Sequence, residues 1–185
     1  LFLLPLLMMS AAVVSCTDEV DESNLYVFTG EQATDYIASQ PELSKYLVLL
    51  KKAKSGKKGS TMDHMLEARG NYTCFVPTND AVQAFIDSVY DTKNYDVNAV
   101  PDSFAQVIVF NSIIDNGNTD AYISTDFQEG VLQLKTMADR YIIIGFAASD
   151  TGRAVTVVNT FSKILVSDRE VGNGVVHVVD HVVMP

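Results

Sequence analysis

Apolar side chains recur at helical spacing through the first half of the chain. In four segments they lie three or four positions apart, the spacing that places them on one face of an α-helix. We therefore predict four amphipathic helices whose apolar stripes face the core: Leu43, Tyr46, Leu47 and Leu50; Met62, Met65 and Leu66; Val82, Phe85, Ile86 and Val89; and Phe104, Val107 and Ile108. Pro41 suits the first turn of the first helix.

Strand signals dominate the second half. Four runs rich in valine and isoleucine are bounded by glycine, aspartate and asparagine, as is typical of β-strands separated by turns. These runs cover 141–146, 154–158, 164–171 and 175–183, and an apolar run at 72–76 is also strand-like. Helices that come first and strands that come later predict an α+β fold rather than an alternating one.

The start of the chain is typical of a secretion signal. Residues 1–14 are almost wholly apolar, and the run is shorter than the roughly 20 residues that span a membrane. A complete signal opens with methionine and basic residues, so we expect a few residues to precede Leu1. The order Val13, Val14, Ser15, Cys16 resembles the bacterial lipobox, which implies removal of residues 1–15 and acylation of Cys16. The alternative is an ordinary signal peptide whose cysteine is incidental.

A short acidic tether follows. After Cys16, residues 17–24 reach at most about 28 Å when extended, so the domain would stand close to the membrane. Asp18 and Glu19 resemble the surface-export signal of Bacteroidetes-type lipoproteins, or they simply keep a linker soluble. With 16–24 as lipidated cysteine and tether, residues 25–185 form one domain long enough to bury a core.

Charge and cysteine content narrow the function classes. The formal net charge of −10, from 23 acidic and 13 basic residues, argues against nucleic acid as a partner. If Cys16 carries lipid, Cys74 has no disulfide partner, because the chain has two cysteines. In its apolar run Cys74 is expected to behave as a small hydrophobe. A catalytic thiol is the alternative, but no motif supports it.

The segment Pro77, Thr78, Asn79, Asp80 has the chemistry of a strand–helix junction. Proline ends the strand, and Thr78 can cap the following helix by accepting hydrogen bonds from its free N–H groups. Asn79 and Asp80 add polar and negative character at the positive end of the helix dipole. We interpret the segment as structural.

A second segment opens with Asn173 and Gly174, a pair typical of tight turns with positive φ. The strand that follows places His177 and His181 on one face and Asp180 on the other. Two imidazoles are too few for a simple strand metal site, and Asp180 points away from them. We expect His177 to be a hydrogen-bonded structural histidine and predict no metal.

Together the two segments resemble the fasciclin-like domain family of cell-adhesion and matrix proteins. The likeness extends over 25–185 and rests on Phe-x-Pro-Thr-Asn-Asp-Ala at 75–81 and on the ending at 173–185. It implies a wedge of β-strands, a sandwich or sheet, with helices packed alongside. It also implies that the two motif strands lie close together in the core.

The chain departs from the family pattern at two places. The family has an aromatic residue where Val82 stands, and its Tyr-His pair, tied to integrin binding in animal members, aligns with Phe110 and Asn111. Integrin binding is therefore not carried over, and the remaining motifs have a structural character.

A lysine cluster is the one strong local charge. Lys51, Lys52, Lys54, Lys57 and Lys58 run from the end of a predicted helix into a glycine–serine loop. Lysines at a helix C-terminus interact favourably with the dipole, and such a loop stays solvated. The functional alternative is a basic loop that contacts anionic glycan or lipid headgroups, at about 1 kcal/mol per lysine.

The chain shows no phosphate loop, no nucleophile elbow and no helical metal pair, so we predict no enzyme, no catalytic residues and no cofactor. We predict a lipid-anchored adhesion or binding module of the outer membrane, facing outward, which contacts a protein or a polysaccharide. Two other classes stay open: an accessory subunit of an outer-membrane nutrient-uptake complex, and an envelope hydrolase with paired carboxylates in a cleft.

Overall fold

The computed structural model describes residues 30–56, 59–148 and 154–185. The predicted signal (1–15), Cys16 and the tether (16–24), together with Lys57 and Lys58, lie outside the described residues. The α-helices are α1 (Ala33–Ser39), α2 (Ser44–Lys52), α3 (Met62–Glu67), α4 (Asn79–Tyr90) and α5 (Asp102–Ser112). Short 3-10 turns are η2 (Pro41–Leu43), η3 (Val97–Ala99) and η4 (Ser124–Asp126).

Seven strands form one sheet in the order β2-β1-β7-β6-β5-β4-β3. They are β1 (Tyr72–Pro77), β2 (Ile113–Asp115), β3 (Gly130–Lys135), β4 (Tyr141–Ala148), β5 (Ala154–Val158), β6 (Ser162–Val171) and β7 (Gly174–Val179). A bridge between Ile114 and Thr136 joins β2 to the chain just after β3, so the sheet is nearly closed. The predicted α+β fold is confirmed.

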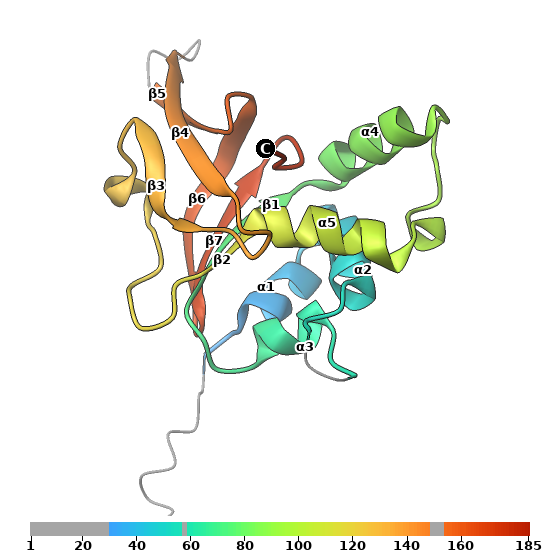
Figure 1. Cartoon of the computed structure of the whole chain (residues 1–185), viewed down its shortest axis with the longest axis horizontal. Helices are drawn as coiled ribbons and strands as arrows, with labels where there is room; N and C mark the ends of the chain where they lie inside the picture. The colour runs from blue at the N-terminus through green and yellow to red at the C-terminus, as the bar shows by residue number, and fades with distance from the viewer. Residues whose placement is uncertain (1–29, 57–58, 149–153) are drawn as a thin grey trace, which may run out of the picture.

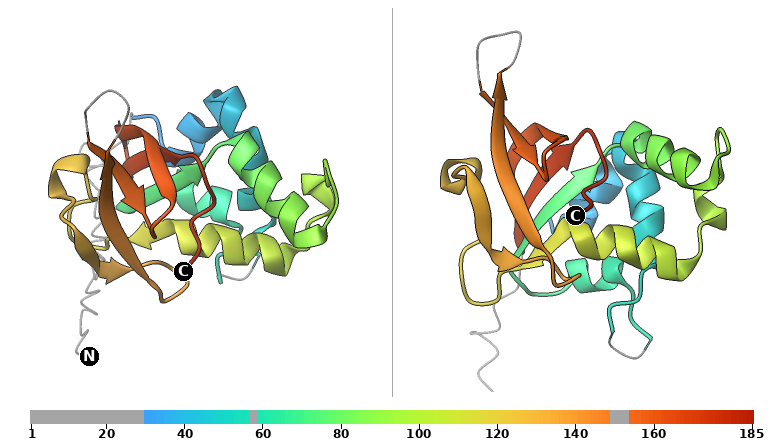
Figure 2. Two further views of the ribbon diagram at one scale, coloured as in Figure 1. Left: turned by 90° about the horizontal axis from the view of Figure 1, so that it is seen from above. Right: turned by 45° about the horizontal axis from the view of Figure 1, so that its top comes forward.

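The helices and the strands occupy separate parts of the molecule. All five α-helices lie on one side of the curled sheet, and the β4–β5 hairpin extends away from them (Figures 1 and 2). No helix in the described part of the chain has the length and the apolar composition that crossing a bilayer requires. This arrangement places β1 and β7 against the helices, and Arg169 of β6 also lies over the Tyr36 ring of α1.

The parallel pair of β1 and β7 separates two apolar cores. Cys74 and Val176 belong to the larger core, together with the apolar faces of the helices. Phe75 and Val179 belong to the smaller core inside the curled sheet, with residues of β3, β4 and β5. Since β1 is buried on both faces, its sequence is a continuous apolar run rather than an alternating one. The two motif strands are therefore neighbours, which confirms the expectation from the family resemblance.

Two predicted core positions and one strand end were wrong. Val89 and Val107 have 47% and 43% of their side chains exposed, although each continues an apolar stripe. Helical periodicity identifies a face, but it does not show where the neighbouring element ends and leaves that face uncovered. The last strand stops at Val179 instead of 183, because the chain then turns and residues 180–185 run back beside α5 (Figure 2).

Candidate functional site

The first motif is used to join elements. Thr78 Oγ1 accepts a hydrogen bond from Ala81 N at 3.3 Å, so the predicted cap of α4 is present. Asn79 does not serve its own helix, because its Oδ1 accepts from Lys45 N at 2.8 Å at the start of α2. Asp80 is exposed in the first turn of α4, and Pro77 ends β1. The motif therefore fixes α4 against β1 and α2.

The second motif begins with a buried asparagine that connects three segments. Asn173 Oδ1 accepts from Ala33 N at 2.9 Å, and its Nδ2 donates to Leu66 O at 2.6 Å and to Ala68 O at 3.0 Å. Gly174 follows with a φ of +143°, and a Cβ there would lie 1.9 Å from Tyr72 O. Only glycine allows this close approach of β7 to β1.

His177 is enclosed in the smaller core. Its side chain has no exposed surface, and its ring stacks on that of Phe75 with 5.4 Å between centroids. Nε2–H donates to Tyr122 O at 2.9 Å, while Nδ1 accepts from Asp168 N at 3.3 Å. Burial lowers the pKa of His177, which the Tyr122 hydrogen bond and nearby Asp168 oppose only in part. Both ring nitrogens are thus used by the neutral form.

Asp180 and Cys74 also have structural surroundings. Asp180 Oδ1 accepts from Lys163 N at 2.7 Å and lies 2.7 Å from His181 Nδ1, so it closes the end of the β6–β7 pair. Cys74 is buried, and burial raises the pKa of its thiol to about 12, which keeps it protonated. Within residues 30–56, 59–148 and 154–185, no group of three or more His, Cys, Asp or Glu side chains could hold a metal ion.

The described lysines of the cluster have intramolecular partners. Lys52 Nζ donates to Asn98 O at 3.0 Å and lies 3.5 Å from the Asp102 carboxylate. Lys54 Nζ lies 3.9 Å from the same carboxylate, whereas Lys51 is exposed at the end of α2. Two of these lysines therefore hold α2 and the loop after it to the start of α5.

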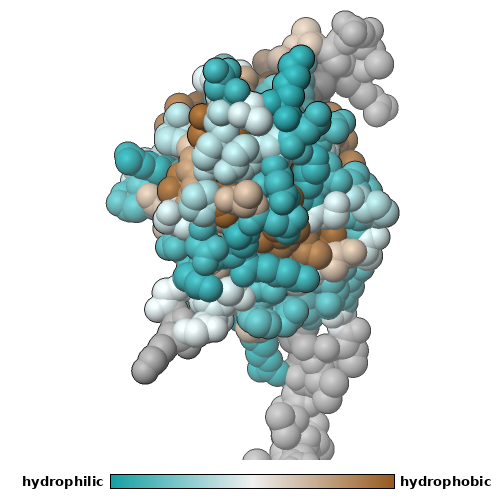
Figure 3. Space-filling view, turned by 90° about the vertical axis from the view of Figure 1, so that its right-hand side faces the viewer, coloured by the Kyte–Doolittle hydropathy of each residue, from teal (hydrophilic) through white to brown (hydrophobic). Residues whose placement is uncertain are grey.

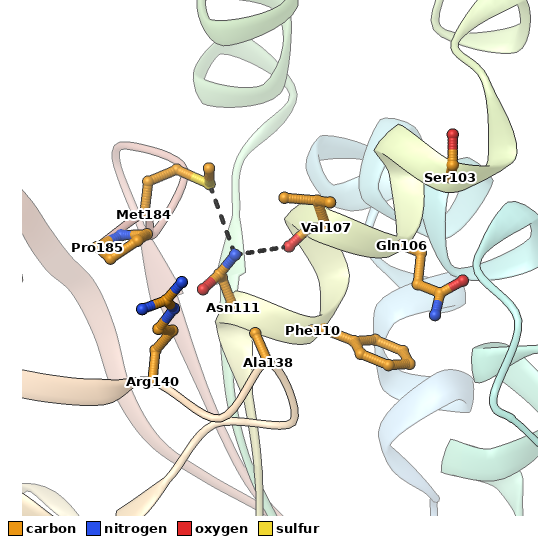
Figure 4. Close-up of a pocket in the computed structure, with 9 residues that line it drawn as sticks. All are labelled: Ser103, Gln106, Val107, Phe110, Asn111, Ala138, Arg140, Met184 and Pro185. Atoms are coloured by element: carbon orange, nitrogen blue, oxygen red, sulfur yellow. Dashed lines mark hydrogen bonds between the residues drawn. The ribbon is translucent and has the colours of Figure 1, made fainter.

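An open groove lies beside α5, and we call it the α5 groove. Its volume is about 500 Å³, and α5, the β3–β4 turn and the C-terminal segment line it (Figure 4). The lining residues are Ser103, Gln106, Val107, Phe110, Asn111, Ala138, Arg140, Met184 and Pro185. The face of the molecule seen in Figure 3 is mostly hydrophilic, with apolar residues only in small separate areas.

The groove combines an apolar wall with hydrogen-bonding groups. Val107 is 43% exposed, and Phe110 and Met184 are half-buried. Asn111 is only 6% exposed, and its Nδ2 donates to Val107 O at 2.9 Å. Arg140 is exposed on the opposite side and makes no ion pair with any described residue. Such a surface can hold a ligand by contact and hydrogen bonding, without any reactive group.

The sequence analysis identified only some of the residues that line this groove. Phe110 and Asn111 were identified as the positions of the family's Tyr-His pair, but nothing marked Arg140 or Met184 as their neighbours. Met184 lies 73 residues along the chain from Asn111, with 4.0 Å between Sδ and Nδ2. The exposed side chain of Val107 is the feature that identifies the groove, and this exposure is visible only in the structure.

A second open cavity of about 650 Å³ lies where the β6–β7 turn meets the chain before β1 and η4. Its polar side chains are Asn71, Asp120, Asp126 and Glu170, and the other lining residues are glycine or apolar. Asp126 Oδ2 accepts from Ile123 N at 3.0 Å and so caps η4. No cationic, hydroxyl, thiol or imidazole side chain among the described residues lines this cavity, so it lacks the mixed chemistry of the α5 groove.

Comparison with known proteins places the fold. The structure is similar to a FAS1 domain pair from the insect cell adhesion molecule fasciclin I, with a TM-score of 0.60 and 19% sequence identity. The similarity covers 83% of this chain and 51% of the other, so the chain spans about half the length of that structure. No curated protein matches the chain. A model of the fasciclin domain matches residues 41–185, and the chain therefore belongs to the fasciclin domain family.

Proposed function

We propose that the chain is an adhesion or binding module of the cell envelope, which contacts a protein or a polysaccharide through the α5 groove. One observation carries the proposal: the groove brings an exposed apolar wall together with Arg140, which makes no ion pair with the described residues, and Asn111 Oδ1, which accepts no hydrogen bond from them. The motif residues Thr78, Asn79, Asn173 and His177 bond within the fold instead. Contact surfaces of proteins typically combine such an apolar centre with polar groups.

The family supports binding rather than catalysis. The matched structure comes from an insect cell adhesion molecule, and the chain shares its fasciclin domain family. The buried thiol of Cys74 and the buried ring of His177 are both held in neutral forms by their surroundings. Neither group has the access to solvent that a nucleophile or a general base needs.

The groove is tested by adding a charge to its apolar wall. Val107→Glu adds a carboxylate to the groove, and Val89→Glu is the matched control on α4, because both valines are exposed to a similar degree. Binding is measured by cosedimentation of the full chain with isolated cell envelopes, in a Cys16→Ala background that removes acylation. We expect Val107→Glu to weaken binding about tenfold or more and Val89→Glu to leave it unchanged. Equal binding by both variants would contradict the proposal.

The proposal includes an anchor at Cys16 and a position on the outer face of the outer membrane. Two or more acyl chains hold a protein stably to a bilayer, and a tether raises the effective concentration of the domain for partners on a neighbouring surface. Labelling cells with a fatty-acid analogue should mark the wild-type chain and not Cys16→Ala. Protease added to intact cells should then remove the anchored domain. A chain that remains protected in intact cells would contradict the outward orientation.

A further inference from the structure

Arg140 makes no ion pair with the described residues of this acidic chain. The formal net charge is −10, and the neighbouring Asp139 carboxylate forms its contact ion pair with Lys135 at 2.7 Å, while Arg140 acts on it only as a nearby charge. Arg169 on β6, by contrast, lies 2.5 Å from the Glu31 carboxylate. No aspartate or glutamate side chain of the described residues lines the α5 groove. The guanidinium of Arg140 therefore offers a planar set of donors to an anion that comes from outside.

Asn111 supplies an acceptor close to this cation. The side chain is more than nine-tenths buried, and its Nδ2 is held by Val107 O at 2.9 Å. Oδ1 accepts no hydrogen bond from the described residues, and Figure 4 shows it on the side of Asn111 that faces Arg140. A ligand that satisfies both groups has an N–H or O–H donor beside a negative charge.

An apolar cavity continues the groove on the other side of Met184. Its volume is about 180 Å³, and its lining residues are Ala81, Ala84, Phe85, Phe161, His181, Val182 and Met184, of which only His181 is polar. Met184 lines both spaces, so neighbouring groups of one ligand can occupy them together. A sugar would bring hydroxyl groups against this apolar wall and leave them without partners, which is unfavourable. An apolar side chain has no such penalty.

We propose that the α5 groove recognises a peptide segment in which a carboxylate side chain stands next to an apolar one. Arg140 binds the carboxylate, Asn111 Oδ1 accepts from a backbone N–H of the peptide, and the apolar side chain enters the cavity beside Phe85. This inference rests on the proposed function, since it names the ligand class of the same groove.

The test compares two fluorescein-labelled hexapeptide pools that differ only in a carboxylate or an amide at one side chain. Both have leucine at the third position and random flanking residues, with aspartate at the fourth position in one pool and asparagine in the other. Fluorescence anisotropy with the full chain carrying Cys16→Ala should show about fivefold to tenfold tighter binding of the aspartate pool. The preference should shrink as salt is raised, because Arg140 is exposed.

Three variants separate the contribution of the Arg140 charge from that of the apolar cavity. Arg140→Gln should remove the preference for aspartate while both pools still bind weakly, and circular dichroism should show an unchanged fold. Lys93→Gln removes the same charge from an exposed loop outside the groove and should keep the preference. Ala84→Glu fills the apolar cavity and should weaken both pools, the aspartate pool most strongly because the added carboxylate repels it.

Several results would overturn the inference: equal binding of the two pools, no binding of either, or a preference that survives Arg140→Gln. Oligogalacturonate that displaces the aspartate pool from the groove at lower concentration than the peptides themselves would assign the site to an acidic polysaccharide instead. Each of these outcomes is compatible with envelope binding that Val107→Glu abolishes, so the proposed function would stand. If Val107→Glu leaves envelope binding intact, the proposed function itself is wrong.

Discussion

At the residue scale, His177 shows how a polar group is accommodated in the smaller core. Its two ring nitrogens bond to backbone groups of Tyr122 and Asp168, and its faces contact Phe75 and Phe127. The Asp168 carboxylate lies 4.0 Å from Nδ1 but accepts from Ser124 N at 2.5 Å and from Ser124 Oγ. Burial would raise the pKa of Asp168, yet these Ser124 hydrogen bonds lower it overall. His177 thus joins the loop at Tyr122 to the irregular part of β6 at Asp168, and both hydrogen bonds need its neutral form.

Stability should therefore fall on mild acidification because of His177. Its pKa in the folded chain is below the ordinary value of 6.5, so the unfolded chain binds the proton first as the pH falls. The stabilisation is complete above about pH 6.5 and is lost as the pH falls through the lowered pKa. Urea unfolding at several pH values should show this decline in the wild type.

His177→Gln should flatten that decline and lower the free energy of unfolding by about 2 kcal/mol at pH 7.5, because buried hydrogen bonds are lost. His181→Gln is the control, since His181 is exposed and has Asp180 as its partner. It should keep the wild-type decline. A His177→Gln protein with the same pH dependence as the wild type would show that another group titrates.

At the element scale, the contact between β1 and β7 organises the fold. The two strands pair in parallel over six residues each, and Tyr72 N donates to Asn173 O just before the pairing begins. Each side of this pair faces one of the two apolar cores. The register depends on Gly174, because any Cβ there would collide with the backbone of Tyr72.

Gly174→Ala should lower the free energy of unfolding by about 3 kcal/mol or more, since it combines a strained positive φ with a backbone clash. Gly145→Ala in β4 is the matched control, because a Cβ there meets no atom within 4 Å. It should change stability by no more than about 0.5 kcal/mol. Chemical denaturation of the two variants measures the difference, and equal midpoints would contradict the structure.

At the scale of the whole molecule, burial is unevenly distributed. The helices cover β1 and β7, whereas the far end of β4 extends beyond both cores (Figure 1). Phe146 in that region is 47% exposed, and Phe75 in β1 has no exposed surface. Since local opening needs less free energy where fewer apolar contacts are broken, the molecule should not open as a single unit.

Native-state hydrogen exchange should resolve this difference. Amides of β1 and β7 should exchange only by global unfolding, with free energies of opening equal to that from urea unfolding. Amides paired between Phe146–Ala148 and Ala154–Thr156 should open at clearly lower free energy. Uniform protection across the sheet, or earlier exchange of β7, would contradict the division into a helix-covered centre and a less protected hairpin.

The sequence alone determined the local structure of this protein, because side-chain periodicity, proline and capping residues act over a few neighbouring positions. It was sufficient for the α+β class, for most long elements and for the junction at Thr78. It did not show α1, β2 or β3. The three residues of β2 directly continue α5, and three residues are too few for a period to appear.

Only the tertiary structure decided which surfaces stay open. Val107 continues a stripe that helical periodicity assigns to the core, yet it is exposed because no element covers that part of α5. Asn111, Arg140 and Met184 come from three distant segments, and they share a groove only after the sheet curls and the C-terminal segment turns back. Local sequence patterns carry no information on contacts between distant segments, so the sequence alone could not predict this groove.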